Sequence, residues 1–264
     1  MTVKSKVAVI TGGGTGIGKQ TALLLAQEGA DVVVLGPLAD ELELVRKEVE
    51  TLSRRCLAYK ANVADEDQVN AAIEASLKSL GQIDVLINNA AILGPAAPVA
   101  QLSLRSWTEE IAVNLTGSFL CCRAVLPAMM EQKSGKIINI TSVAGQRAYP
   151  LRSAYAVSKA GLIALTRTLA AEVGPYNIRV NAIAPGPVSG NRMKRVIEER
   201  ARSTGQSTAE VEASYLGALA LGRMVEEEDV ARMALFLASC FRARGQHNGP
   251  GIQRLFRLQS RIRR

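Results

Sequence analysis

The sequence predicts a single α/β domain in which helices cover both faces of a doubly wound parallel sheet. Short apolar runs alternate along the chain with amphipathic helical patterns, and such alternation is typical of parallel strands joined by crossover helices. The first apolar run ends in a glycine cluster that leads directly into a helical pattern. Ligands of such sheets bind at the carboxyl ends of the strands, so we expect a ligand site there.

The expected strands are short and rich in branched aliphatic residues, as strands buried on both faces are. They cover residues 7–10, 32–35, 57–59, 83–87, 136–140 and 178–183. The expected helices cover about residues 17–28, 39–53, 65–80, 104–131, 153–173 and 191–202. No linker or internal repeat divides residues 1–240, so we expect one domain there.

The composition limits the class of protein. A chain of 264 residues with 48% hydrophobic and 21% charged residues has the profile of a globular protein with a sizeable core. It contains no run of about 18 apolar residues and no signal-peptide pattern, so we expect a cytoplasmic protein without a membrane span. The four cysteines, Cys56, Cys121, Cys122 and Cys240, lack metal-ligand spacing, which predicts free thiols and no metal site.

The positive charge is concentrated in residues 241–264, which contain seven arginines and no acidic residue. Removing those seven charges from the net charge of +8 leaves +1 for the rest of the chain. That remainder carries no nucleic-acid motif, so we expect no nucleic-acid partner. The only histidine, His247, lies in the same segment, so a histidine-based triad or metal site would depend on that residue alone.

A glycine-rich stretch, TGGGTGIG at residues 11–18, separates the first strand from the first helix. Glycines permit a tight turn and close approach of backbone to a pyrophosphate, while the helix N-terminus favours negative charge. The stretch therefore predicts dinucleotide binding. The candidate binding residues are Gly12, Gly14, Thr15, Gly16, Ile17 and Gly18.

The end of the second strand leaves the choice between NAD and NADP open. An acidic residue there would bind the ribose diol and repel a 2′-phosphate. The strand ends in Leu35, Gly36 and Pro37, and the nearby acid, Asp31, lies at its start. The missing acid favours NADP, but no arginine stands there to bind a phosphate either.

Tyr155 and Lys159 lie four residues apart, on one face of the helix expected at 153–173. A half-buried tyrosine beside the stem of a lysine would explain the pair without any chemistry. Acid–base chemistry near neutral pH, however, needs a group with a shifted pKa, and this chain has a single histidine. A positive charge next to the phenol would lower the pKa of Tyr155 from its ordinary value of about 10.

In order and spacing, these motifs resemble the short-chain dehydrogenase/reductase superfamily over about residues 5–240. The matching positions are TGxxxGxG at 11–18, Asn88-Asn89-Ala90-Ala91, Asn114, Ser142, YxxxK at 155–159 and Pro185-Gly186. The resemblance implies a Rossmann-like fold and an NAD(P)-dependent oxidoreductase that interconverts a secondary alcohol and a ketone. It also implies a homo-oligomer, either a dimer or a tetramer.

The resemblance assigns four catalytic residues. Tyr155 would be the general acid/base, and Lys159 would lower its pKa and bind the nicotinamide ribose. Ser142 would hydrogen-bond the substrate oxygen, and Asn114 would hold a water that relays protons. Each has a structural alternative, since Ser142 could cap a turn and Asn114 could bond to nearby backbone.

The resemblance also implies further cofactor contacts, at Asn62, Val63, Asn89, Ala90, Pro185, Gly186 and Val188, and gives Asn88 a role in stabilising the sheet. Two positions depart from the family: Asn62 replaces the usual acid, and Ser189-Gly190 replaces a sequence with threonine. Residues 189–225 would form the substrate loop. Its cations, Arg192, Lys194 and Arg195, would receive an anionic substrate, unless Arg195 pairs with Glu199 on an exposed helix face.

The resemblance stops near residue 240. The arginine-rich segment 241–264 is atypical, and its abrupt change of composition suggests that a reading-frame shift replaced the usual ending. We therefore expect the last edge strand of the family's sheet to be missing. A cofactor-binding or scaffold protein without catalytic activity is the alternative function, because a fold alone does not prove catalysis.

Overall fold

The computed structural model describes residues 3–239 and 256–257. Within these residues, one sheet of seven parallel strands has the order β3-β2-β1-β4-β5-β6-β7. The direction of progression reverses between β1 and β4, and open α/β sheets bind ligands beyond the carboxyl ends of the strands at such a point. The strands are β1 (Val7–Thr11), β2 (Asp31–Gly36), β3 (Cys56–Lys60), β4 (Val85–Asn88), β5 (Gly135–Ile140), β6 (Ile178–Ala184) and β7 (Phe256–Arg257).

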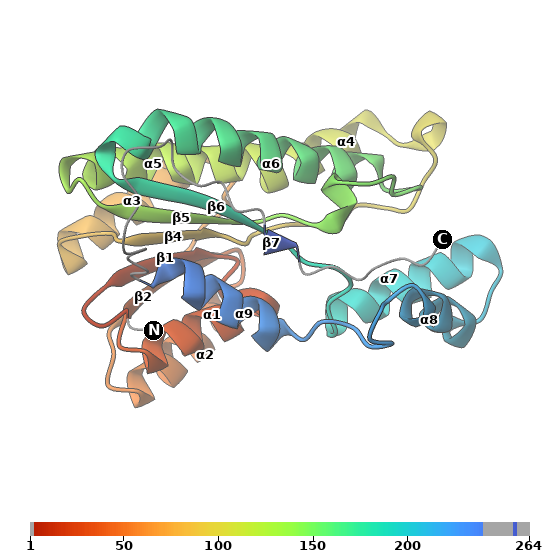
Figure 1. The fold of residues 1–264 in the computed structure, drawn as a ribbon, viewed down its shortest axis with the longest axis horizontal. Helices are drawn as coiled ribbons and strands as arrows, with labels where there is room; N and C mark the ends of the chain where they lie inside the picture. The colour runs from red at the N-terminus through yellow and green to blue at the C-terminus, as the bar shows by residue number, and fades with distance from the viewer. Residues whose placement is uncertain (1–2, 240–255, 258–264) are drawn as a thin grey trace.

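Helices cover both faces of the sheet, as the alternating sequence pattern predicted. Helices α1, α2 and α9 lie on one face, and α3, α5 and α6 lie on the other (Figure 1). The α-helices of the described residues are α1 (Gly16–Gln27), α2 (Ala39–Thr51), α3 (Glu66–Leu80), α4 (Leu104–Ile111), α5 (Gly117–Glu131), α6 (Ser153–Val173), α7 (Asn191–Thr204), α8 (Thr208–Gly217) and α9 (Glu227–Ala238).

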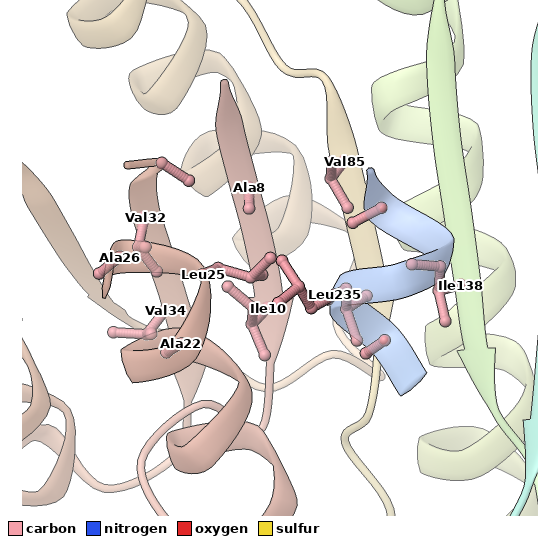
Figure 2. Packing of buried hydrophobic residues seen from close by; sticks show 14 of the residues in the cluster. Ala8, Ile10, Ala22, Leu25, Ala26, Val32, Val34, Val85, Ile138 and Leu235 are labelled. Carbon is pink, nitrogen blue, oxygen red and sulfur yellow. The ribbon is translucent and has the colours of Figure 1, made fainter. Parts of the chain in front are cut away.

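Two apolar clusters sandwich the sheet, because successive strand residues point to opposite faces. Val34 packs with Ile10, Leu25 and Leu235 on the side of α1 and α9 (Figure 2). Its neighbour Val33 belongs to the cluster on the opposite face. Each fully buried aliphatic side chain contributes about 1.5–3 kcal/mol of transfer free energy, so these clusters provide the main stabilisation of the fold.

The helix expected at 104–131 is divided into α4 and α5 by a π-helical turn, Ala112–Thr116. By length and composition alone, residues 104–131 could cross a membrane. Here, however, α5 packs against α3, β4 and β5, and it buries Cys121, Val125 and Met129 in the apolar cluster on that face. This segment is therefore a core helix of the domain.

The segment 189–225 forms a separate helical pair beyond the carboxyl ends of the strands (Figure 1). Helices α7 and α8 share an apolar cluster that includes Met193, Ile197 and Val211, with Leu93 packed against it. Helix α8, like α9, was not predicted from the sequence. Its sequence signal is the capping box of Ser207 and Glu210, in which each side chain bonds the backbone of the other.

The expectation that the sheet lacks a seventh strand is wrong. A two-residue strand, β7, lies in parallel register with Ile183 and Ala184 of β6. The edge of β6 offers unpaired backbone groups, and another segment can pair with them whatever its side chains are. The remaining tail residues, 240–255 and 258–264, lie outside the described residues, as do Cys240, His247 and the proposed change of reading frame.

Candidate active site

The glycine loop between β1 and α1 has a conformation that favours glycine. Gly12 and Gly16 have φ angles of 62° and 57°, in the left-handed region. A Cβ atom on Gly18 would lie 2.1 Å from the backbone oxygen of Gly12, so α1 begins in close contact with the turn. The loop therefore presents backbone rather than side chains to a ligand.

Thr11 and Asn89 fix this loop to the end of β4. The backbone N–H groups of Asn89 and Ala90 both donate to Thr11 Oγ1, at 3.0 Å. Asn89 Nδ2 donates to the backbone oxygens of Thr11 and Gly12, also at 3.0 Å. The structure thus brings Gly12, Asn89 and Ala90 together where the order of the strands reverses.

The first turn of α1 suits an anionic group. Thr15 is the N-cap residue, its side chain makes no capping bond, and the first turn contains no acidic residue. The N–H groups at the start of a helix have no partner within the helix, and they attract negative charge. The glycine loop and this turn therefore fit a dinucleotide pyrophosphate, which Gly12, Gly16, Ile17 and Gly18 would hold.

Glu227, in the first turn of α9, is an acidic residue at this cradle that was not predicted from the sequence. Its Oε1 atom lies 3.3 Å from the position of a Cβ on Gly16 and 2.7 Å from that of a Cβ on Gly190. Burial raises the pKa of Glu227, and the charge of Glu226 adds to the rise. No sequence signal marked the residue, because acidic residues are common in the first turn of any helix.

Asn62 and Val63 follow β3 and have different surroundings. Asn62 is exposed, and its Oδ1 atom accepts a hydrogen bond from the Ala64 N–H at 3.0 Å. Val63 is buried, and a Cβ on Gly117 would lie 2.7 Å from its Cγ2 atom. Val63 therefore packs closely against the start of α5, and the adenine contact expected of both residues stays a prediction.

The turn after β6 lies beside the end of β5. The Val143 N–H donates to the Pro185 oxygen at 3.1 Å, and Val188 forms a parallel bridge with Val225. A Cβ on Gly186 would meet nothing within 4 Å, so this position is open. The Ser189 hydroxyl donates to Glu226 Oε1 at 3.0 Å, which ties the turn to α9.

Helix α6 brings Tyr155 and Lys159 to the end of β5. Lys159 Nζ lies 5.7 Å from the centre of the Tyr155 ring and donates to the Ile140 oxygen at 2.9 Å. Ser142 Oγ accepts a hydrogen bond from the Ala144 N–H at 3.1 Å and is hydrogen-bonded to the Tyr155 side chain. Ser142 therefore caps a turn, as the structural alternative expected, and also contacts the phenol.

Burial is the largest influence on the pKa values of Tyr155 and Lys159. It raises the pKa of Tyr155, against the positive charge of Arg192 and the hydrogen bond with Ser142, which lower it. Burial, followed by the charge of Arg192, lowers the pKa of Lys159 to about 7, against the opposing effect of Glu110.

The expected lowering of the Tyr155 pKa by Lys159 stays a prediction, since burial raises that pKa and the groups that oppose the rise are Arg192 and Ser142. An amine whose pKa is about 7 is only about half charged at neutral pH. The side chain that carries the opposing positive charge is Arg192, which comes from helix α7.

Asn114 lies in the π-helical turn and is fully buried. Its Oδ1 atom accepts from the Ile92 N–H at 2.8 Å, and Nδ2 donates to the Ile92 oxygen at 3.0 Å and to Ser158 Oγ at 3.2 Å. The side chain thus joins the loop after β4 to α6, and both amide hydrogens are engaged. The water-mediated relay of protons by Asn114 stays a prediction.

Of the three cations on α7, Arg192 reaches the site. Its Nη2 atom donates to the Ala91 oxygen at 2.5 Å, and its charge acts on both Tyr155 and Lys159. Helix α7 thus contributes a guanidinium whose charge acts on the predicted general acid/base, Tyr155.

The expected pair between Arg195 and Glu199 is not the one that forms. Glu199 instead accepts from Arg152 Nη2, at 2.5 Å. Arg152 is 6% exposed, and a buried cation needs a counter-charge more than a solvated one does. The contact joins α7 to the residue that precedes α6.

Glu110 on α4 is a second buried charged residue that sequence analysis missed. It accepts a hydrogen bond from the Gly94 N–H, whereas Arg152 donates to the Gly94 oxygen. Burial raises the pKa of Glu110. Its Oε1 atom has no hydrogen-bond partner among the described residues.

Asn88 has the position in the sheet that the resemblance implied. Its Nδ2 atom donates to Asn139 Oδ1 on β5 at 2.9 Å, and Asn139 Nδ2 donates to Thr166 Oγ1 on α6 at 2.8 Å. Asn139 was missed, although a polar residue inside the apolar strand 136–140 was a visible signal.

The described part of the chain contains no group of three or more His, Cys, Asp or Glu side chains that could hold a metal ion. Cys56, Cys121 and Cys122 are free, buried thiols. Burial raises the pKa of each to about 12, so these thiols are not activated nucleophiles.

Comparison with known proteins adds independent support. Residues 6–201 match the family model of the short chain dehydrogenases. A 3-oxoacyl-[acyl-carrier-protein] reductase of Thermotoga maritima is 41% identical over 239 residues, which cover 90% of this chain and 92% of that protein. Levodione reductase of Leifsonia aquatica is 37% identical over 240 residues, which cover 89% of this chain and 87% of that protein.

Solved structures give the same result. The crystal structure of NAD+-bound xylitol dehydrogenase superimposes with a TM-score of 0.87 and 33% identity, over 90% of this chain and 93% of that one. The structure of levodione reductase has a TM-score of 0.85 and 33% identity, over 89% and 91% of the two chains. With its glycine loop, Rossmann-type sheet and YxxxK helix, the chain belongs to the short-chain dehydrogenase family of NAD(P)-dependent oxidoreductases.

Proposed function

We propose that the protein interconverts a secondary alcohol and a ketone by hydride transfer, with Tyr155 as general acid/base. The observation that carries this proposal is the meeting of Tyr155, Ser142 and Lys159 at the strand ends next to the glycine loop. The nicotinamide, when bound, gives the hydride to the carbonyl carbon or accepts it from the carbinol carbon.

The chain's own residues would handle the substrate oxygen and the proton. In reduction, the Tyr155 hydroxyl gives its proton to the carbonyl oxygen as that oxygen gains negative charge. Ser142 donates a hydrogen bond to the same oxygen and so stabilises that charge. Lys159 supplies positive charge when it is protonated, and in oxidation Tyr155 takes the proton back.

The substrate class rests on the relatives. Their names describe reduction of 3-oxoacyl thioesters on a carrier protein, reduction of levodione and oxidation of cis-4-hydroxycyclohexanecarboxylate. All three involve a carbon that carries a ketone or a secondary hydroxyl. Arg192 beside Tyr155 favours a substrate with an anionic or strongly polar group near the reacting carbon.

We also propose a cytoplasmic homo-oligomer, either a dimer or a tetramer. Exposed apolar side chains on the outer surfaces of α5 and α6, Phe119 at 43% and Val157 at 46% exposed, support contact between copies. Light scattering of the purified protein tests this, and a monomer at micromolar concentration would contradict it.

The function is tested by titrating NADH and NADPH separately, following nicotinamide fluorescence, and then by screening ketones and alcohols with the cofactor that binds. We expect micromolar binding and turnover of at least one cyclic or acyl ketone. Binding without any turnover would favour the alternative, a cofactor-binding scaffold protein. A folded protein that binds neither dinucleotide would contradict the proposal.

A further inference from the structure

We propose that Glu41 makes the protein select NAD(H) over NADP(H), by binding the adenosine ribose diol and repelling a 2′-phosphate. The inference rests on the proposed function, because it concerns the cofactor of the same glycine loop.

The glycine loop lies against the carboxyl end of β2, where sheets of this type bind the ribose. The Gly13 N–H donates to the Leu35 oxygen at 3.2 Å. A Cβ on Gly13 would lie 2.7 Å from Val34 Cγ1, so the loop touches the strand directly. A ribose next to this loop must therefore lie beside the residues that follow β2.

The two residues between β2 and α2, Pro37 and Leu38, supply no acidic group. The strand ends at Gly36, and a Cβ there would lie 3.4 Å from Leu42 Cδ2 of α2. Because α2 begins at Ala39, its first turn comes back over the glycine loop. There, Glu41 Cβ lies 3.0 Å and Glu41 Oε2 lies 3.4 Å from the position of a Cβ on Gly14.

The Glu41 carboxylate is also available for a ligand. Within the described residues it has no hydrogen bond or ion pair, whereas three other acids of α2 are engaged. Glu43 and Glu50 pair with Arg46, and Glu48 pairs with Lys19. An ionised carboxylate only accepts hydrogen bonds, which suits two vicinal hydroxyls. A 2′-phosphate in their place would bring like charges together.

Lys60 is the cation that could favour the opposite choice. It ends β3, lies opposite Gly36 in the β2–β3 register and is exposed. An exposed lysine is a hydrated point charge on a flexible stem, whereas Glu41 is half-buried against the loop itself. We therefore assign the selectivity to Glu41.

The test compares dissociation constants of NADH and NADPH for the wild-type protein, Glu41→Gln, Glu43→Gln and Lys60→Gln, from nicotinamide fluorescence without substrate. We expect the wild-type protein to bind NADH at least tenfold more tightly than NADPH. In Glu41→Gln this ratio should fall at least tenfold, chiefly through tighter NADPH binding. Glu43→Gln removes the same charge from the same helix away from the loop, and it should keep the wild-type ratio.

Equal or tighter NADPH binding by the wild-type protein would overturn the inference and leave the proposed function intact. An unchanged ratio in Glu41→Gln would also overturn it. An NADPH preference that Lys60→Gln removes would assign the selectivity to Lys60 instead. Failure of the folded wild-type protein, checked by circular dichroism, to bind either dinucleotide would contradict the proposed function together with this inference.

Discussion

A phenol and an amine in one buried site do not keep their solution pKa values. Burial favours the neutral form of both, so the pKa of Tyr155 rises and that of Lys159 falls to about 7. Lys159 Nζ donates to the Ile140 oxygen, which holds the amine in place in either protonation state. The charged groups that modify this balance, Arg192 and Glu110, come from other helices.

Replacing Glu227 by Gln should tighten the binding of NADH and NADPH alike. The carboxylate lies against Gly16, where the pyrophosphate is expected, and removing a repulsion of about 1 kcal/mol gives roughly fivefold tighter binding. In the wild-type protein, affinity should rise as the pH falls through the raised pKa of Glu227, because the protonated side chain no longer repels the ligand. The measurement is the dissociation constant as a function of pH.

The matched control for that prediction is Glu228→Gln, which lies on the same helix and pairs with Arg232 on an exposed face. It should leave both dissociation constants unchanged. Affinities of Glu227→Gln that equal those of the wild-type protein across the pH range would show that this carboxylate does not face the bound anion.

For single residues, motif spacing predicted the placement of Tyr155, Lys159 and Ser142, because the helix repeat and the strand end fix their positions. It could not predict Glu41 or Glu227. Each comes from the first turn of a helix, where an acidic residue is ordinary, and only the packing of that helix on the glycine loop gives it a ligand-facing position.

Helix α7 lies in the segment proposed as the substrate loop, and its Arg192 acts on the pKa of Tyr155. Its apolar side packs on α8 and Leu93, while two charged residues reach back to the sheet domain. Arg192 contacts the Ala91 oxygen, and Glu199 contacts Arg152 just before α6. A change in the position of α7 therefore alters the charge next to Tyr155.

Replacing Arg192 by Gln should shift the pH dependence of alcohol oxidation to higher pH. In the proposed mechanism, oxidation needs the phenolate of Tyr155, and the positive charge of Arg192 lowers the pKa of that phenol. Without this charge the phenolate forms only at higher pH, so the rising limb of kcat/KM against pH moves upward.

Lys194→Gln removes the same charge from the exposed side of the same helix, and its profile should overlay that of the wild-type protein. A profile of Arg192→Gln that stays in place or moves to lower pH would contradict the assigned effect of Arg192.

Most element boundaries follow from apolar periodicity, although the sequence pattern did not predict α8 or α9. The π-helical turn in 104–131 could not be predicted, because the apolar pattern continues through it. The turn contains Asn114, whose buried contacts with Ile92 and Ser158 join segments distant in the sequence and so leave no local pattern. The pairing of Glu199 with Arg152 could not be predicted either, because it also joins residues distant in the sequence.

The whole molecule depends on a polar link inside an otherwise apolar sandwich. Asn88, Asn139 and Thr166 connect β4, β5 and α6 by hydrogen bonds of 2.8–2.9 Å, and all three side chains are buried. Buried polar groups are costly unless they are paired, so this chain of bonds requires β4, β5 and α6 to assemble in one arrangement.

Replacing Asn139 by Ala should lower the free energy of unfolding by about 2–4 kcal/mol, because it removes two buried hydrogen bonds and opens a small cavity. Urea denaturation measures the change. Asn70→Ala, on the partly exposed surface of α3, should stay within about 0.5 kcal/mol of the wild-type protein. A similarly small change in Asn139→Ala would contradict the role of this link.

The sheet as a whole could be predicted because its strands are buried on both faces and leave continuous apolar runs in the sequence. Strand β7 could not be predicted, since a two-residue pairing at a sheet edge is made by backbone groups and leaves no side-chain pattern.

The most direct test of the proposed chemistry is the ketone-reduction rate of Tyr155→Phe, measured beside its NADH dissociation constant. The account predicts a fall in kcat of at least about 100-fold, with NADH binding within about threefold of the wild-type value. Tyr176→Phe, which removes an exposed hydroxyl, should keep the wild-type rate. A Tyr155→Phe protein that keeps more than about a tenth of the wild-type rate would show that Tyr155 is not the general acid/base.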